Sequence, residues 1–92
     1  MKATITTQSR TLEQILTPED YGIFRGKYTT MWGAIFHNTG SNSIYIETGK
    51  AATTSDSYEL KPGSKIIAGF FSDAVQTEFK TATWESELII LF

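Results

Sequence analysis

The sequence predicts an all-β protein: a single small antiparallel β-sandwich of jelly-roll or immunoglobulin-like type, preceded by a short N-terminal arm. Thr, Ser and Ile are frequent whereas Leu and Ala are few, and this composition favours strands over helices. About six or seven short strand-like segments are separated by turn signals at intervals of roughly 8–12 residues, which is typical of a sandwich or a small barrel. The final segment, Leu88 to Phe92, is entirely apolar.

The size and charge of the chain limit what it can be. It has 92 residues, no cysteine and a net charge of −2. This length allows one marginally stable domain, which can gain stability from dense packing or from partner subunits. The scattered cations argue against nucleic acid as a partner, and no apolar run approaches the roughly 20 residues that span a membrane. Since no signal-peptide pattern follows Met1, we expect synthesis in a cytoplasm.

The segment from Thr29 to Leu60 is predicted to be a hairpin and the centre of the sheet. Thr29, Thr30, Trp32, Ile35 and Phe36 are β-branched or aromatic, and a Gly/Ser/Asn cluster follows them. Residues 43–47 then alternate between apolar and polar, which predicts a strand with one face in water. A loop of about five residues between the two strands favours antiparallel pairing.

The first 28 residues have a different pattern. Residues 2–8 alternate weakly, as an edge strand or an extended arm would. Thr11 and Gln14 fit a helical capping box, and Thr17-Pro18 fits a second helix start. Gly22 and Gly26 are interpreted as a bend into the first core strand. We therefore predict an arm over residues 1–28, carrying one or two short helical turns, and a sandwich core over residues 29–92.

The second half of the chain reads as strands separated by loops. Residues 48–57 are small and polar, which indicates a mobile surface loop. Lys61-Pro62-Gly63-Ser64 predicts a tight turn with positive φ at the glycine. Residues 65–71 form an apolar run, interpreted as a strand covered on both faces, and residues 75–81 alternate as a strand with one wet face. The last strand must lie inside the sheet or beneath a neighbouring chain, because it would aggregate as an exposed edge.

No residue pattern predicts catalysis, a cofactor or a metal ion. His37 is the single histidine and has no evident orienting carboxylate, so a structural role is favoured. Glu47, Glu59, Glu78, Glu85 and Glu87 are dispersed and fit solvated strand faces. Neither a phosphate-binding loop nor a nucleophile elbow is present. The aromatic residues could stack on sugars or bases, but core and subunit contacts are their commoner use. They are Trp32, Trp84, Tyr45, Tyr58, Phe70 and Phe71.

Several segments together resemble small virion proteins of tailed phages. The run from His37 to Asn42, the strand Ile44-Tyr45-Ile46 and the turn Leu60-Lys61-Pro62-Gly63 are similar to a pattern in that family. There, a strand ending in Asn leads through a Gly/Ser/Asn turn to a strand such as Val-Tyr-Ile-Gly, then to a Leu-x-Pro-Gly turn. A short hydrophobic strand closes the chain. The resemblance covers roughly residues 30–92, and this sequence carries Glu47 where many of those proteins carry Gly.

The resemblance implies a non-enzymatic structural protein of a bacteriophage virion. The family includes capsid decoration (cement) proteins and fibre domains. We expect a capsid decoration protein or a small capsid or vertex component, assembled as a symmetric homo-oligomer such as a trimer or pentamer and bound to the major capsid protein. A carbohydrate-binding module of a phage fibre is an alternative, and a single-strand nucleic-acid binder with an oligonucleotide-binding barrel is a weaker one. The expected intersubunit surface consists of Leu12, Ile15, Leu16, Tyr21, Ile23 and Phe24.

Overall fold

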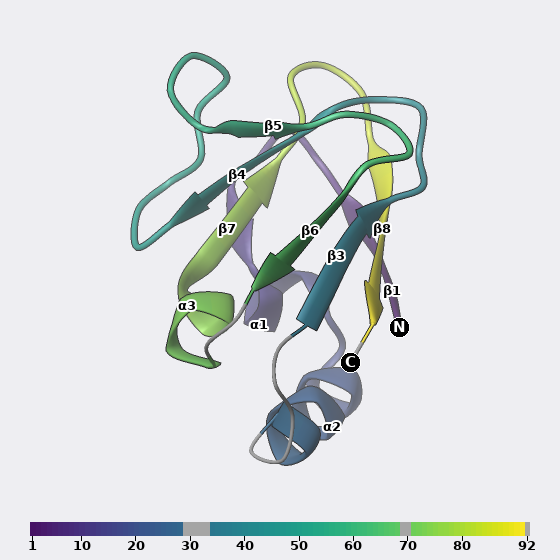
Figure 1. Cartoon of the computed structure of the whole chain (residues 1–92), viewed down its shortest axis with the longest axis vertical. Helices are drawn as coiled ribbons and strands as arrows, with labels where there is room; N and C mark the ends of the chain where they lie inside the picture. The colour runs from purple at the N-terminus through teal and green to yellow at the C-terminus, as the bar shows by residue number, and fades with distance from the viewer. Residues whose placement is uncertain (29–33, 69–70, 92) are drawn as a thin grey trace.

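The computed structural model describes residues 1–28, 34–68 and 71–91, and within these residues eight strands form two four-stranded antiparallel sheets. Sheet A has the order β1-β8-β3-β6, and sheet B has the order β2-β7-β4-β5. The strands of sheet A are β1 (Lys2–Ile5), β8 (Ser86–Leu91), β3 (Ala34–Asn38) and β6 (Lys65–Ala68). Those of sheet B are β2 (Arg10–Thr11), β7 (Thr77–Lys80), β4 (Ile44–Thr48) and β5 (Tyr58–Leu60). The expectation of a mostly β, antiparallel protein is therefore confirmed (Figure 1).

The core lies between the two sheets, where alternate side chains of each strand point inward. In β3 the buried residues are Ala34, Phe36 and Asn38, and in β4 they are Ile44 and Ile46. The ring of Phe36 in sheet A meets the ring of Phe79 in sheet B edge to face, with centroids 5.2 Å apart. Such contacts between the inner faces hold the sheets together, chiefly by removing apolar surface from water.

The predicted hairpin is wrong, because its two strands belong to different sheets. Strand β3 pairs with β6 and β8, whereas β4 pairs with β5 and β7. The connection over residues 39–43 therefore crosses from one sheet to the other. A five-residue loop is compatible with either course. In the structure, the buried side chains of β3 and those of β4 enter the core from opposite sheets. Thr29, Thr30 and Trp32 lie outside the described residues.

The N-terminal segment is part of the same body as the rest of the chain. Strand β1 pairs with β8, and β2 pairs with β7, so residues 1–28 contribute a strand to each sheet. The predicted arm that docks elsewhere has no counterpart in this pairing. Helix α1 (Leu12–Ile15) begins with the predicted capping box, in which the backbone N–H of Thr11 donates to Gln14 Oε1 at 2.8 Å.

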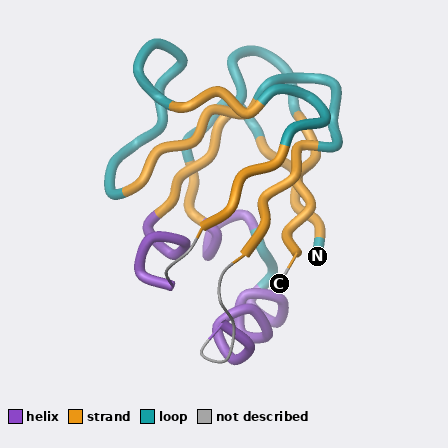
Figure 2. Tube along the Cα trace, in the orientation of Figure 1, coloured by secondary structure: helices purple, strands orange, loops and turns teal. Residues whose placement is uncertain are grey.

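Helix α2 (Pro18–Tyr28) replaces the predicted bend at Gly22 and Gly26. Its start is as predicted, since Thr17 Oγ1 accepts a hydrogen bond from the Asp20 N–H at 3.1 Å. Two glycines weaken a helix by about 1 kcal/mol each. Complete burial of Phe24 offsets this cost, because a buried Phe side chain contributes about 1.5–3 kcal/mol. Figure 2 shows the helices gathered at one end of the sandwich.

The segment after the turn at residues 61–64 also departs from expectation. The turn itself is as predicted: Gly63 has a φ of 84° and the Ser64 N–H donates to Lys61 O at 2.9 Å. Strand β6, however, is an edge strand with an exposed outer face, not a strand covered on both faces. Helix α3 (Phe71–Gln76) then stands where the strand over residues 75–81 was expected to begin, and only Thr77–Lys80 is extended.

The last strand lies inside the sheet, which is one of the two placements predicted for it. Strand β8 lies between β1 and β3, and its Leu88 and Ile90 side chains are fully buried. The backbone N–H of Ile90 donates to Met1 O at 2.7 Å, and the N-terminal ammonium donates to Ile90 O at 2.7 Å. Strand β1 therefore covers one edge of β8 within the same subunit.

Candidate docking face and inter-sheet cavity

The outer face of sheet A carries an apolar row, which we call the sheet A patch: Ile35, Ile67, Ile89 and Leu91. These residues alternate with the buried positions of β3 and β8 and with the half-buried positions of β6. Ile35 lies beside Ile67 on one neighbouring strand and beside Leu91 on the other. Ile67 is 72% exposed and Leu91 is 47% exposed. Large apolar side chains that gather on one solvent face are typical of an interaction surface.

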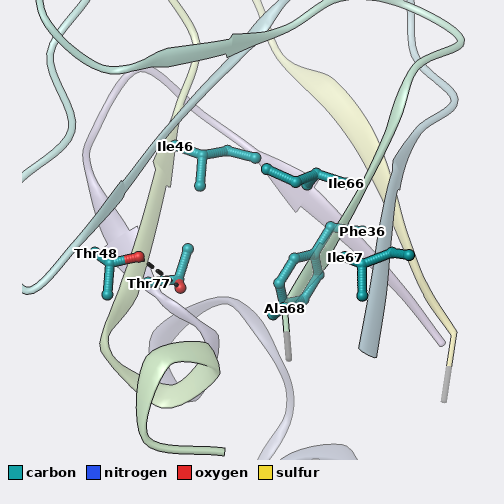
Figure 3. Close-up of a pocket in the computed structure, with 7 residues that line it drawn as sticks. All are labelled: Phe36, Ile46, Thr48, Ile66, Ile67, Ala68 and Thr77. Carbon is teal, nitrogen blue, oxygen red and sulfur yellow. Dashed lines mark hydrogen bonds between the residues drawn. The ribbon is translucent and has the colours of Figure 1, made fainter. Parts of the chain in front are cut away.

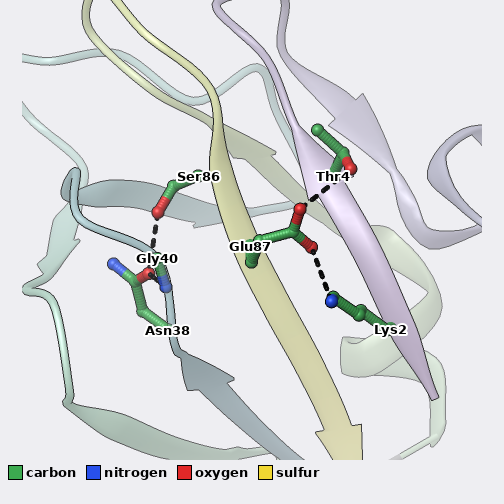
Figure 4. A network of polar contacts seen from close by, with 6 residues as sticks. All are labelled: Lys2, Thr4, Asn38, Gly40, Ser86 and Glu87. Carbon is green, nitrogen blue, oxygen red and sulfur yellow. Dashed lines mark hydrogen bonds and ion pairs between the residues drawn. The ribbon is translucent and has the colours of Figure 1, made fainter.

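Charged and titratable side chains border the sheet A patch on the same face. Lys65 and Ile89 flank His37 in the strand register, and Lys2 lies beside Ile89. Figure 4 shows Glu87 between β1 and β3, where Lys2 Nζ lies 3.9 Å from Glu87 Oε2 and Thr4 Oγ1 lies 3.5 Å from Glu87 Oε1. An apolar centre with a polar rim is the usual anatomy of a protein–protein contact.

The outer face of sheet B is different in kind. It presents Glu47, Glu59 and Glu78, and each carboxylate accepts a hydrogen bond from a serine: from Ser57 at 3.1 Å, from Ser43 at 2.7 Å and from Ser9 at 2.9 Å, respectively. Glu47 and Glu78 face each other in the register of β4 and β7. Such a face is suited to water. The outer face of sheet A thus carries the exposed apolar row, whereas that of sheet B carries three carboxylates.

A cavity of about 360 Å³ opens between the sheets at the edge where β6 lies. Figure 3 shows its walls, with residues from β3 and β6 on one side and from β4 and β7 on the other. Most of the wall is apolar, and the polar groups are the hydroxyls of Thr48 and Thr77, whose oxygens are 3.4 Å apart. The lining residues are Phe36, Ile46, Thr48, Ile66, Ile67, Ala68 and Thr77.

The predicted intersubunit surface is not a surface of the folded chain. Leu12, Leu16 and Phe24 are buried in the core of the same subunit, and Ile15 and Tyr21 pack against that core. Of the six predicted residues, Ile23 alone has a large exposed side chain. The apolar residues at these positions do bury against a partner, but that partner is the core of the same subunit, because α1 and α2 cover one end of the sandwich.

The remaining predicted candidates are spread over the molecule. His37 lies on the outer face of sheet A, as do Lys65 and Glu87. Trp84, in the β7–β8 connection, is 74% exposed, and Tyr58 on β5 is 56% exposed. Trp32 and Phe70 lie outside the described residues. Among the described residues, no three His, Cys, Asp or Glu side chains gather as a metal site.

The polar centre of the fold is Asn38, which the sequence pattern indicated only as a turn residue. Its side-chain amide is fully buried at the point where β3, the 39–43 connection, β5 and β8 meet. Nδ2 donates to Asn42 O at 2.8 Å and to Leu60 O at 2.9 Å. Oδ1 accepts from the Gly40 N–H at 3.1 Å and from Ser86 Oγ at 2.9 Å (Figure 4). Asn38 therefore joins the two sheets near the loops opposite the helices.

Comparisons with protein-family models, with curated proteins and with solved structures find no match to this chain. In the described part of the chain, none of the helices has the length and apolar character needed to cross a membrane. The function is therefore proposed from the geometry of the folded chain.

Proposed function

We propose that this chain is a jelly-roll structural protein of a bacteriophage virion, either a capsid decoration (cement) protein or a small capsid or vertex component. The strand pairing supports the jelly-roll assignment. Strand β1 pairs with β8, β2 with β7, β3 with β6 and β4 with β5, which is the pairing of one long hairpin rolled into two sheets. Eight-stranded double-sheet rolls are a common architecture of viral capsid proteins.

The observation that carries the proposal is the sheet A patch. In a solitary sandwich the outer faces alternate with the core and are expected to be polar. Here Ile67 and Leu91 are exposed on an outer face while the neighbouring sheet presents carboxylates. Burying such a face against a second protein contributes roughly 25 cal/mol per Å² of apolar surface. The work of the protein is thus association, and no reaction is assigned to it.

The partners proposed are further copies of the chain, as a trimer or pentamer, and the major capsid protein. The closing strand β8 is paired with β1 within one subunit, so its burial does not require assembly. The sheet A patch is the feature that favours assembly instead. Repeated contacts in closed symmetry would multiply a modest interface over many copies. The protein would be made in the host cytoplasm and would reside in the virion.

Light scattering coupled to size exclusion tests the association. Ile67→Glu places a charge in the sheet A patch, and Tyr58→Glu is its matched control, an exposed large side chain on the edge strand of the other sheet. We expect the parent and Tyr58→Glu to share one oligomeric mass, and Ile67→Glu to weaken association at least about tenfold. A parent chain that stays monomeric at high concentration would contradict self-assembly.

Particle analysis tests the virion assignment. Phage particles purified on a gradient from cells that express the chain should contain it in a fixed whole-number ratio to the major capsid protein, measured by quantitative mass spectrometry. The Ile67→Glu variant should be depleted from the particles and Tyr58→Glu should not. Particles that lack the parent chain would refute the assignment.

A carbohydrate-binding module is the second candidate, favoured by the exposure of Trp84 and Tyr58. Exposed aromatic rings give sugars an apolar surface on which to stack. Titration of the protein with host glycans should then quench or shift tryptophan emission, and Trp84→Ala should remove the response. Unchanged emission would dismiss this candidate. The oligonucleotide-binding alternative requires a five-stranded barrel, and the described residues form two four-stranded sheets instead.

A further inference from the structure

The cavity between the sheets exists because β5 covers only part of β4. Ile44 and Ile46 have partners in β5, whereas Thr48 pairs with β7 and lies beyond the end of β5. On the opposite side, β6 is the edge strand of sheet A. The inner faces of β4 and β7 therefore separate from those of β3 and β6 at this edge, as Figure 3 shows. The resulting space of about 360 Å³ is open to solvent at this edge, so a small molecule could enter it without disturbing the packed core.

The chemistry of the walls limits the occupant. Phe36, Ile46, Ile66 and Ala68 supply apolar surface, and the seven described lining residues carry no charge. The hydroxyls of Thr48 and Thr77 lie 3.4 Å apart on one wall. A hydroxyl offers one donor and two acceptor sites, so the Thr48 hydroxyl has capacity for a group on a ligand in addition to its contact with Thr77. Most of a well-matched ligand is therefore apolar, with its polar group at one end.

We propose that this pocket binds a neutral small molecule consisting of an aliphatic chain or ring system with a single hydroxyl group. Pockets of roughly 300–1,000 Å³ with apolar walls and few polar groups are typical small-molecule sites. An apolar cavity of about 150 Å³ takes one benzene ring. The larger space here suits a molecule of about ten heavy atoms. Its hydroxyl would meet Thr48, and its hydrocarbon part would cover Ile66 and Ala68, which keep accessible surface in the pocket. This inference does not depend on the proposed virion role.

Nuclear magnetic resonance titration with 1-octanol tests the proposal, with octanoate as a probe of equal chain length that carries a charge. We expect saturable chemical-shift changes at Phe36, Ile46 and Thr77 with 1-octanol, and binding at least tenfold weaker with octanoate. Changes that do not saturate, or that map to Leu91 and Ile89 on the sheet A patch, would overturn the proposal. Equal affinity for the two probes would overturn the assignment of a neutral ligand.

Two variants test separately the role of the Thr48 hydroxyl and the role of the pocket volume. Thr48→Val keeps the shape of a side chain at the pocket mouth and removes its oxygen, so the affinity for 1-octanol should fall roughly threefold to tenfold. Ala68→Leu fills the space and should abolish saturable binding. Thr53→Val, in the β4–β5 connection outside the lining, is the matched control and should bind as the parent does. A folded Thr48→Val with parental affinity, or a folded Ala68→Leu that still binds, would contradict the assigned pose.

Discussion

Replacing Asn38 with Ala should be among the most destabilising single changes in this protein. The side-chain amide makes four hydrogen bonds, all between 2.8 and 3.1 Å, and its residue is fully buried. Alanine would remove both donors and the acceptor. The Leu60 carbonyl and the Ser86 hydroxyl, which lie in buried surroundings, would lose partners that water does not readily replace.

The magnitude follows from the number of bonds. Each hydrogen bond contributes about 1 kcal/mol net, and a buried group left without a partner costs about 1–3 kcal/mol. The loss should therefore be about 3–5 kcal/mol. A domain of this size has a free energy of unfolding of roughly 5–14 kcal/mol. Asn38→Ala should thus remove about a fifth of the stability or more and lower the urea midpoint accordingly.

The control comes from the same turn. Asn42 Nδ2 makes one exposed hydrogen bond, to Glu85 O at 2.9 Å, so Asn42→Ala should cost no more than about 1 kcal/mol. Ser86→Ala removes a single bond to Asn38 Oδ1 and should cost about 1–2 kcal/mol, which gives a measurable step if Asn38→Ala does not fold. Equal urea midpoints for Asn38→Ala and Asn42→Ala would refute the role assigned to the buried amide.

Three further predictions concern stability, all measured by thermal and urea unfolding followed by circular dichroism. Gly22→Ala and Gly26→Ala should each stabilise α2 by about 0.5–1 kcal/mol, because a Cβ at either position meets nothing within 4 Å; a loss at both would show that the helix is not formed there. Gly40→Ala should destabilise the folded protein by about 1–3 kcal/mol, because its Cβ would overlap Ser86 Oγ and the backbone nitrogen of Glu87. Thr81→Val should be neutral or stabilising by about 1 kcal/mol, because the buried Thr81 hydroxyl has no hydrogen-bond partner among the described residues. A loss of stability of more than about 1 kcal/mol would show that the hydroxyl does have a partner.

Features that depend on a few neighbouring residues could be predicted from the sequence. The turn at Pro62-Gly63, the capping box at Thr11 and the alternation of Ile44 and Ile46 are examples. In each case the determining interaction lies within about four residues, so local chemistry decides the outcome. The bend expected at Gly22 and Gly26 is not formed. Here the burial of Phe24 against residues distant in the sequence outweighs the local preference of the two glycines.

The apolar outer face of sheet A could not be predicted from the sequence pattern. In Leu88-Ile89-Ile90-Leu91 and in Ile66-Ile67 every position is apolar, so alternation does not tell which side faces the core. The structure assigns Leu88 and Ile90 to the inside and leaves Ile67 and Leu91 outside. The predicted surface in α1 and α2 failed because an apolar helix face needs a partner, and the sequence does not say whether that partner is the same chain or another.

The amino-acid sequence by itself determined the β character, the positions of most turns and the need to bury the last strand. Only the tertiary structure decided that β3 and β4 lie in different sheets, that the first residues complete both sheets, and which apolar residues stay in water. The physical reason is that strand pairing and burial are made by residues far apart in the chain. Their partners are chosen by the packing of the whole molecule and not by the neighbours in sequence.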